Sequence, residues 1–95
     1  MAYTFEWDNK KDRENLKKNG IPFSVAIEAF YDERRIITRD PAHSIEEKRY
    51  FCYGDVRGAV LTVRFTWRGT KIRIIGAAVW RKGKKIYAEK NKVRR

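Results

Sequence analysis

Two segments that alternate between apolar and polar side chains meet at a glycine turn in the second half of the chain. Residues 59–67 (AVLTVRFTW) and 71–75 (KIRII) are rich in β-branched and aromatic residues. Because successive side chains of a strand point to opposite faces, this pattern predicts a β-hairpin with one apolar and one basic face. The apolar face would carry Leu61, Val63, Phe65, Trp67, Ile72 and Ile74, and the basic face Arg64, Thr66, Lys71 and Arg73.

The predicted register of this hairpin places arginines opposite one another. A loop of either Arg68-Gly69 or residues 67–70 puts Arg64 opposite Arg73, and a loop of residues 55–58 before it adds Arg49 to the same row. Like charges across a ladder are unfavourable unless an anion lies between them. The row therefore indicates a phosphate site, and arginines that extend separately into water are the alternative.

The net charge of +11 is concentrated in one part of the chain. Residues 1–63 contain 11 Lys and Arg and 11 Asp and Glu, whereas residues 64–95 contain 12 Lys and Arg and one acidic residue, Glu89. A basic segment beside a balanced one indicates a polyanionic partner, either nucleic acid or an acidic protein surface. The candidates for nucleic-acid binding in this segment are Arg64, Lys71, Lys82, Lys84 and Lys85.

The length and cysteine content restrict the class of protein. A chain of 95 residues suits one compact domain, and the single Cys52 allows no intramolecular disulfide, which favours a reducing compartment. The amino terminus lacks the apolar run of a signal peptide, and no segment is long enough to span a membrane. We expect a cytoplasmic protein with a single domain over residues 1–95 and a frayed basic tail at residues 90–95.

Capping residues predict two helices in the first third of the chain. Residues 3–7 (YTFEW) alternate aromatic and polar side chains, which is typical of a short strand. Asp8 is a suitable N-cap for a helix over residues 9–19, and Ser24 for a shorter helix over residues 25–31.

Strand and turn patterns complete the predicted order. Strands are expected over residues 35–38, 48–53, 59–67 and 71–75, and a basic helix, interrupted at Gly83, over residues 80–93. The resulting order, β-α-α-β-β-β-β-α, defines an α+β domain with a mostly antiparallel sheet.

A series of short motifs is spread along nearly the whole chain, at Phe5, Trp7-Asp8, Lys11, Asn15, Lys18, Gly20, Phe23, Ala26, Phe30, Asp32, Asp40, His43-Ser44, Glu47, Arg49, Thr66, Arg68-Gly69 and Ile72-Arg73-Ile74-Ile75. In their order and spacing these residues resemble the BrnT-type toxins of bacterial toxin–antitoxin pairs. There are two departures from the family pattern. Asn19 replaces a common histidine, and Gly76-Ala77-Ala78 replaces Ser-Ala-Arg, so an arginine is missing for which the run at residues 80–85 (WRKGKK) offers other cations.

The resemblance implies a compact fold like that of RelE-type ribonucleases and cleavage of RNA. It also implies a cognate antitoxin with a ribbon-helix-helix DNA-binding domain, which forms a hetero-oligomer with the toxin. The alternative function is a non-catalytic basic module that binds nucleic acid or an acidic partner protein.

Arginines are the first candidates for catalysis. RNA needs no external nucleophile when its 2′-hydroxyl attacks the adjacent phosphate, so the protein must orient the strand and stabilise charge. Planar guanidinium groups pair with phosphate oxygens at any working pH. Arg73 and Arg68 rank first among the candidates, and Arg49 and Arg81 follow.

His43 is the only histidine, which leaves it as a single candidate acid or base beside Glu47 or Tyr87. The alternative is a structural role, in which Ser44 and Glu47 form a capping box next to it.

Three polar residues, Lys11, Asn15 and Lys18, share one face of the first predicted helix and form either a second RNA contact or a solvated face. Of the tryptophans Trp7, Trp67 and Trp80, we expect at least two in the core and consider base stacking as the alternative. The sequence contains no metal-ligand cluster, P-loop or dinucleotide fingerprint, and we therefore expect no metal and no cofactor.

Overall fold

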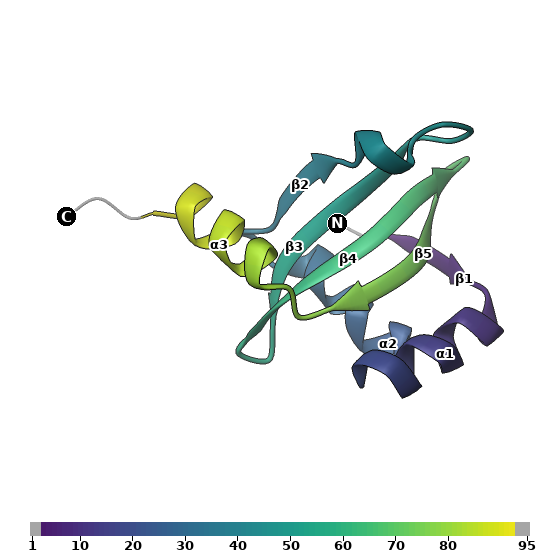
Figure 1. Cartoon of the computed structure of the whole chain (residues 1–95), viewed down its shortest axis with the longest axis horizontal. Coiled ribbons are helices and arrows are strands. Elements are labelled where there is room, and N and C mark those ends of the chain that lie inside the picture. The colour runs from purple at the N-terminus through teal and green to yellow at the C-terminus, as the bar shows by residue number, and fades with distance from the viewer. Residues whose placement is uncertain (1–2, 93–95) are drawn as a thin grey trace.

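The computed structural model describes residues 3–92 and contains a five-stranded sheet with helices on both faces (Figure 1). The strands lie in the order β1-β5-β4-β3-β2; β1 pairs with β5 in parallel and every other pair is antiparallel. The predicted α+β class and element order are confirmed. Along the chain the elements are β1 (Thr4–Trp7), α1 (Asn9–Asn19), α2 (Phe23–Ala26), the 3₁₀ segment η1 (Ile27–Tyr31), β2 (Ile36–Arg39), the 3₁₀ turn η2 (Pro41–His43), β3 (Arg49–Val56), β4 (Ala59–Arg68), β5 (Lys71–Ala78) and α3 (Arg81–Lys90).

One face of the sheet forms the hydrophobic core with α2 and η1. Phe30 of η1 meets Phe65 of β4 edge to face, with ring centroids 5.0 Å apart. Each fully buried side chain of this size contributes about 1.5–3 kcal/mol to folding. The predicted apolar face of the hairpin is confirmed, except that Trp67 beside the turn is 46% exposed. The strand residues buried here are Cys52, Val56, Leu61, Val63, Phe65, Ile72, Ile74 and Ala77.

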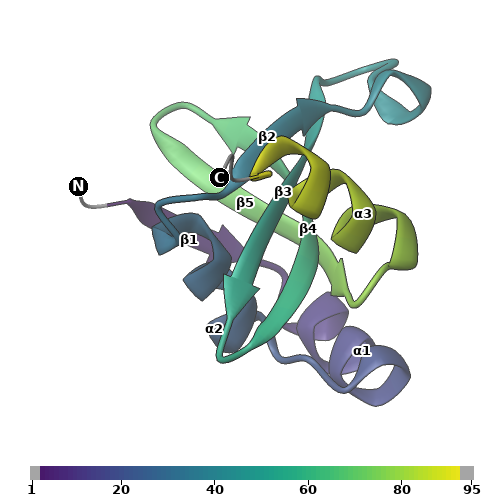
Figure 2. The ribbon, with the colours of Figure 1, turned by 90° about the vertical axis from the view of Figure 1, so that its left-hand side faces the viewer.

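The opposite face of the sheet carries α3 at one end and is open elsewhere (Figure 2). Gly83 of α3 is buried, and a Cβ atom there would overlap Thr62 Oγ1 and lie 3.0 Å from the ring of Tyr53. A residue without a side chain therefore lets α3 cross β3 and β4 at close range. The expected interruption at Gly83 is wrong, because the glycine serves packing and leaves the helix continuous.

The first helix begins and ends as predicted. The Asp8 carboxylate accepts hydrogen bonds from the backbone N–H groups of Lys10 (2.7 Å) and Lys11 (3.2 Å), which lower its pKa below the ordinary value. Gly20 ends the helix with a φ of 73°. The expected Ser24 cap is wrong. The Asp12 carboxylate instead accepts the N–H of Phe23 (2.8 Å), which is the first residue of α2.

The turn between β4 and β5 has two residues, as in the shorter of the two predicted loops, but it lies one residue later in the chain, and this changes the register. Arg68 pairs with Lys71 across Gly69-Thr70, so that Thr66 pairs with Arg73. A bulge next to Arg64 then places Arg64 opposite Gly76. Gly69, with a φ of 61°, supplies the positive φ that the first residue of a two-residue hairpin loop requires.

The turn between β3 and β4 is shorter than predicted. Arg57 and Gly58 form it with φ values of 55° and 92°, and Arg49 consequently pairs with Thr66. The predicted row of Arg49, Arg64 and Arg73 is therefore wrong. Thr66 separates Arg49 from Arg73, and Arg64 lies two residues further along the same face.

The end of α3 is attached to the segment before β2. The Tyr87 hydroxyl donates to the Asp32 carboxylate (2.6 Å), and the Asn91 amide donates to the carbonyl of Arg34 (2.9 Å). Lys90 still belongs to α3, and the last part of the predicted frayed tail, residues 93–95, lies outside the described residues. Within residues 3–92 no helix has the length and apolar character needed to cross a membrane.

Candidate functional site

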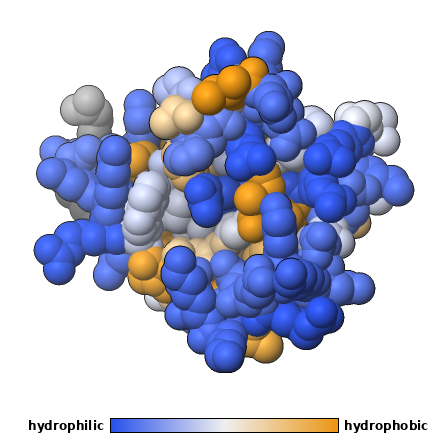
Figure 3. Space-filling model, turned by 45° about the vertical axis from the view of Figure 1, so that its right-hand side comes forward, coloured by the Kyte–Doolittle hydropathy of each residue, from blue (hydrophilic) through white to orange (hydrophobic). Residues whose placement is uncertain are grey.

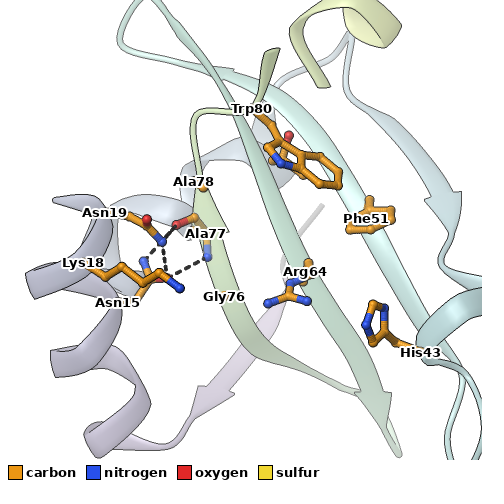
Figure 4. Close-up of a pocket in the computed structure, with 11 residues that line it drawn as sticks. Asn15, Lys18, Asn19, His43, Phe51, Arg64, Gly76, Ala77, Ala78 and Trp80 are labelled. Atoms are coloured by element: carbon orange, nitrogen blue, oxygen red, sulfur yellow. Dashed lines mark hydrogen bonds between the residues drawn. The ribbon is translucent and has the colours of Figure 1, made fainter. Parts of the chain in front are cut away.

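A groove of about 320 Å³ opens on the sheet face that α3 leaves free (Figure 4). The carboxyl-terminal end of α1 and strand β5 form one wall, and the turn η2 lies on the other side, beyond β3. Among the described residues, the groove is lined by no acidic side chain. Its lining includes the basic or titratable side chains of Lys18, His43 and Arg64 and the aromatic rings of Phe51 and Trp80.

The register of the sheet builds the floor of this groove. Phe51 of β3, Arg64 of β4 and Gly76 of β5 lie side by side across the strands. A Cβ atom on Gly76 would lie 3.6 Å from Arg64 Nη2, so the guanidinium group rests directly over the glycine. This is an ordinary van der Waals distance, and the Arg64 side chain extends from β4 over β5 toward α1 (Figure 4).

Two asparagines attach α1 to the edge of the groove. The Asn15 amide donates to the carbonyls of Ile21 (2.8 Å) and Ala77 (2.9 Å) and accepts the N–H of Ala77 (3.2 Å). The Asn19 amide donates to Ala77 O and to Asn15 Oδ1, both at 3.1 Å. Asn15 is thus occupied in holding the backbone. Of the predicted polar face of α1, Asn15 and Lys18 line the groove, while Lys11 lies outside it.

His43 is held by a buried carboxylate. Its Nδ1 atom lies 2.9 Å from Asp40 Oδ2, and the Asp40 side chain is 6% exposed against 55% for His43. A carboxylate can only accept a hydrogen bond, so Nδ1 donates, and in the neutral imidazole this places the lone pair on Nε2. A histidine arranged in this way is suited to accept a proton.

The expected capping box at Ser44 and Glu47 is wrong. The Ser44 hydroxyl donates to the carbonyl of Asp40 (2.5 Å) and accepts the N–H of Arg49 (2.9 Å), so it closes the loop between β2 and β3. A second bond between these strands, from Asp40 N–H to Arg49 O (2.8 Å), closes the same loop. Residues 45–47 form bends and start no helix. The loop thus holds His43 at the side of the groove.

Three arginines on the open face are paired with carboxylates. Glu47 lies 3.5 Å from both Arg49 Nη2 and Arg68 Nε, and Glu6 Oε2 lies 3.0 Å from Arg73 Nη1. Arg49, Arg68 and Glu47 line a separate hollow next to the groove, which His43 also borders. Arg64, in contrast, has no carboxylate at ion-pair distance within the described part of the chain.

The other predicted cations lie outside the groove. Lys71 pairs with Arg68 at the hairpin turn, and Arg81, Lys82, Lys84 and Lys85 are exposed on α3. Position 78, where the resemblance leads us to expect arginine, is Ala78 and lines the groove. The cations that line the groove with it are Lys18 and Arg64, and from the run at residues 80–85 only Trp80 reaches the groove.

Tyr87 is not a partner of His43. It lies in another hollow beside Asp32 and Asp55, where burial, reinforced by the hydrogen bond to Asp32 and its charge, raises the pKa of Tyr87 to about 12. Cys52 is likewise removed from the groove, and burial raises the pKa of its thiol to about 12. Within residues 3–92, no three His, Cys, Asp or Glu side chains are grouped so that they could hold a metal ion.

Sequence reasoning missed two groups of this site. From the sequence, Asp40 is identified only as a position shared with the family that the chain resembles, although an aspartate three residues before the only histidine is a signal for an oriented imidazole. Phe51 received no role, although strand alternation places it on the same face as Arg49. The expectation that at least two tryptophans are buried is wrong, because only Trp7 packs against the core while Trp67 and Trp80 are 46% and 42% exposed.

The fold and the groove define a small basic α+β protein whose open sheet face suits an anionic ligand. Residues 7–83 match the family described as the ribonuclease toxin BrnT of type II toxin–antitoxin systems. Because this match covers most of the chain, the protein belongs to the BrnT family, as the resemblance predicted. It is thus a ribonuclease toxin with RNA as the substrate class and an antitoxin as its partner. A comparison with curated proteins gave no match.

Proposed function

We propose that the protein is an endoribonuclease that cleaves RNA in the groove by attack of the 2′-hydroxyl on the adjacent phosphate. The observation that carries this proposal is that His43, oriented by Asp40, lines the same groove as the unpaired Arg64 and as Lys18. A proton acceptor and two cations in one groove are the groups that such a reaction requires.

Each group has a defined task in the reaction. His43 Nε2 takes the proton of the 2′-hydroxyl as the oxygen attacks phosphorus. The bond from phosphorus to the 5′-oxygen then breaks, the leaving oxygen takes a proton from water, and His43 gives its proton to the resulting hydroxide. The products are a 2′,3′-cyclic phosphate and a 5′-hydroxyl end. Arg64 and Lys18 stabilise the charge on the non-bridging oxygens. Since the substrate supplies the nucleophile, we propose that cleavage needs no metal ion.

The paired arginines bind the strand beyond the scissile phosphate in this proposal. Arg49, Arg68 and Arg73 lie on the open face toward the hairpin turn, each beside a carboxylate. These pairs are partly exposed and therefore weak, so a phosphate can compete with Glu6 or Glu47 for the guanidinium groups. Glu47 orients the arginines in this arrangement. The basic surface continues through Lys71, Arg81, Lys82, Lys84, Lys85 and Lys11.

The partner is proposed to be an antitoxin with a ribbon-helix-helix DNA-binding domain, and the two proteins would act in the cytoplasm as a hetero-oligomer. Family membership supports an antitoxin, and the type of its domain is the part that we propose. Co-expression with the product of a neighbouring small gene, followed by purification through a tag on that product, tests this. Recovery of the toxin with a ribbon-helix-helix protein is the expected outcome.

The catalytic assignment is tested with purified protein and labelled single-stranded RNA in the presence of EDTA. We expect cleavage to 2′,3′-cyclic phosphate ends, with losses of roughly 10²- to 10⁴-fold for His43→Ala and 10²- to 10³-fold for Arg64→Ala. Arg73→Ala tests the first sequence-based candidate in the same assay.

Arg57→Ala is the control for the loss of one positive charge, because Arg57 lies in the β3–β4 turn and pairs with Glu28 (2.6 Å) away from the groove. Its cleavage rate should equal that of the wild type. Stable retention of intact RNA by the wild-type protein would support the non-catalytic binding module instead.

A further inference from the structure

An exposed tryptophan borders the groove at the end where α3 begins. Trp80 directly precedes α3 and is 42% exposed. Its ring centroid lies 5.4 Å from that of Phe51 with a tilt of 44°, and among the described residues it has no other aromatic neighbour. Rings of this size are usually largely buried, so a partly free tryptophan at the edge of a groove is a candidate for stacking on a ligand.

The other residues that line this groove include polar and positively charged side chains. Arg64 lies opposite Phe51 in the sheet and has no carboxylate partner in residues 3–92. Asn19 donates both of its recorded hydrogen bonds through Nδ2, and its Oδ1 accepts none from the described residues. A stacking surface, a free acceptor and a cation therefore border one groove (Figure 4).

This combination matches a nucleotide and fits an apolar side chain poorly. A base can stack its planar π face on Trp80 and form hydrogen bonds with Asn19 through its polar edges. The flanking phosphate carries the negative charge that would pair with Arg64. An apolar protein side chain would cover the ring but offer no negative charge to Arg64 and Lys18. The hydrophobic side chains on this side of the molecule form small separate patches and no broad apolar surface (Figure 3).

We infer that Trp80 and Phe51 form a nucleobase subsite, in which one base of a single-stranded RNA stacks on Trp80 while Arg64 binds the adjacent phosphate. The inference rests on the proposed function, because that proposal places RNA in this groove. It adds that the protein recognises a base of the RNA as well as its phosphate backbone. Stacking on an aromatic side chain strengthens binding by roughly 5- to 150-fold per base.

The test uses single-stranded deoxyhexanucleotides, because DNA lacks the 2′-hydroxyl and is bound without being cleaved. Homopolymers of adenine, cytosine and thymine are compared with an abasic hexamer that has the same number of phosphates, by NMR titration of the full chain. The wild-type protein should bind at least one base-containing hexamer roughly 5- to 150-fold more tightly than the abasic one. The Trp80 indole N–H signal should shift only with bases.

Variants separate stacking from charge. Trp80→Leu keeps an apolar contact with Phe51 and should lose the preference for bases while its affinity for the abasic hexamer stays unchanged. Trp80→Ala should behave in the same way, and circular dichroism verifies that both variants fold. Arg64→Ala should weaken the binding of both ligands. Trp67→Ala is the matched control, because Trp67 is 46% exposed but lies outside the groove, and it should retain the wild-type preference.

Equal wild-type affinity for base-containing and abasic hexamers would overturn the inference, as would a preference that survives in folded Trp80→Leu. A Trp80→Leu protein with a normal base preference but lost antitoxin binding would assign the ring to the antitoxin interface and would also overturn it. None of these measurements depends on cleavage. The base subsite can therefore fail while the ribonuclease proposal, which the cleavage assay tests, still holds.

Discussion

Asp40 is the residue on which the orientation of His43 depends. Its carboxylate accepts the imidazole Nδ1–H, while its backbone bonds with Arg49 and Ser44 close the surrounding loop. A buried carboxylate in this place selects the tautomer and the ring orientation. Asp40 does not line the groove in which we place RNA, so it acts through His43 as a positioning residue.

Replacing Asp40 with asparagine should therefore reduce kcat and leave KM unchanged. We expect a loss of roughly 10- to 10⁴-fold in kcat, because the amide no longer favours the tautomer with a free Nε2. Steady-state cleavage of a short RNA, with melting temperatures measured for each variant, checks this. Ser44→Ala is the matched control, since Ser44 closes the same loop without touching the imidazole. A rise in KM in Asp40→Asn, or equal losses of kcat in both variants, would indicate a merely structural role.

The structure also changes the order of the candidate arginines, because Arg64 and not Arg73 lines the groove. Strand alternation correctly placed Arg64 and Arg73 on one face, but it could not indicate which of them is free. Arg73 is paired with Glu6, a residue 67 positions away in the sequence, and Arg64 is opposite Gly76. Contacts over such separations depend on the sheet order, which the local pattern does not contain.

At the level of elements, two turns set the composition of the groove. Both hairpins were predicted from their strands, but the β4–β5 turn lies one residue later than expected. The β3–β4 turn is shorter than expected and places the non-glycine Arg57 at a φ of 55°. Positive φ is uncommon for such a residue, so the sequence favoured a longer loop. The shift moved Arg64 away from Arg73 and toward Gly76, where its guanidinium group reaches the groove.

Near its carboxyl-terminal end, helix α3 is attached to the rest of the domain by a hydrogen bond between two ionisable side chains, Tyr87 and Asp32. Burial and the bond to Asp32 raise the pKa of Tyr87 to about 12. Burial acts to raise the pKa of Asp32, but hydrogen bonds from Tyr87 and from the N–H groups of Asp55 and Arg34 outweigh it and hold this pKa below the ordinary value. The contribution of Asp32 is therefore present above pH 4 and is lost as the pH falls through its lowered pKa.

The Tyr87 contribution should be lost at alkaline pH. Because the folded pKa lies above the ordinary value of 10.0, the stabilisation is complete below pH 10 and decreases toward pH 12. Tyr87→Phe should cost about 1–2 kcal/mol at pH 8, and urea unfolding at pH 8 and pH 11 should show a smaller difference from the wild type at the higher pH. Tyr31→Phe is the control, because this hydroxyl has only a 3.5 Å contact with a backbone N–H. A difference that stays constant with pH would contradict the prediction.

At the level of the whole molecule, the charge division of the sequence is partly cancelled by folding. Glu6 and Glu47 come from the balanced half of the chain and pair with Arg73 and Arg68 of the basic half. The cations that remain available, among them Arg64 and Lys18, lie on one groove with no acidic lining in the described chain. A phosphate meets no competing carboxylate there.

The salt dependence of binding should reveal this difference between free and paired arginines. Log affinity for a single-stranded hexamer should fall linearly with log salt, and Arg64→Ala should reduce the slope by about 0.7, the value for one phosphate contact. Arg73→Ala should reduce it less, because binding there first breaks the pair with Glu6. Titrations at several KCl concentrations measure the slopes. Arg57→Ala provides the baseline, and an unchanged slope for Arg64→Ala would remove Arg64 from the phosphate site.

The sequence by itself determined the elements, the face on which each hairpin side chain lies, the excess positive charge and the family resemblance. These properties follow from local periodicity and composition, which act within a few residues. Only the tertiary structure decided the register of the sheet, the pairing of Arg73 with Glu6 and the meeting of His43, Arg64 and Trp80 at one groove. These arrangements depend on turn geometry, on a bulge and on contacts between distant segments, which only the folded chain brings together.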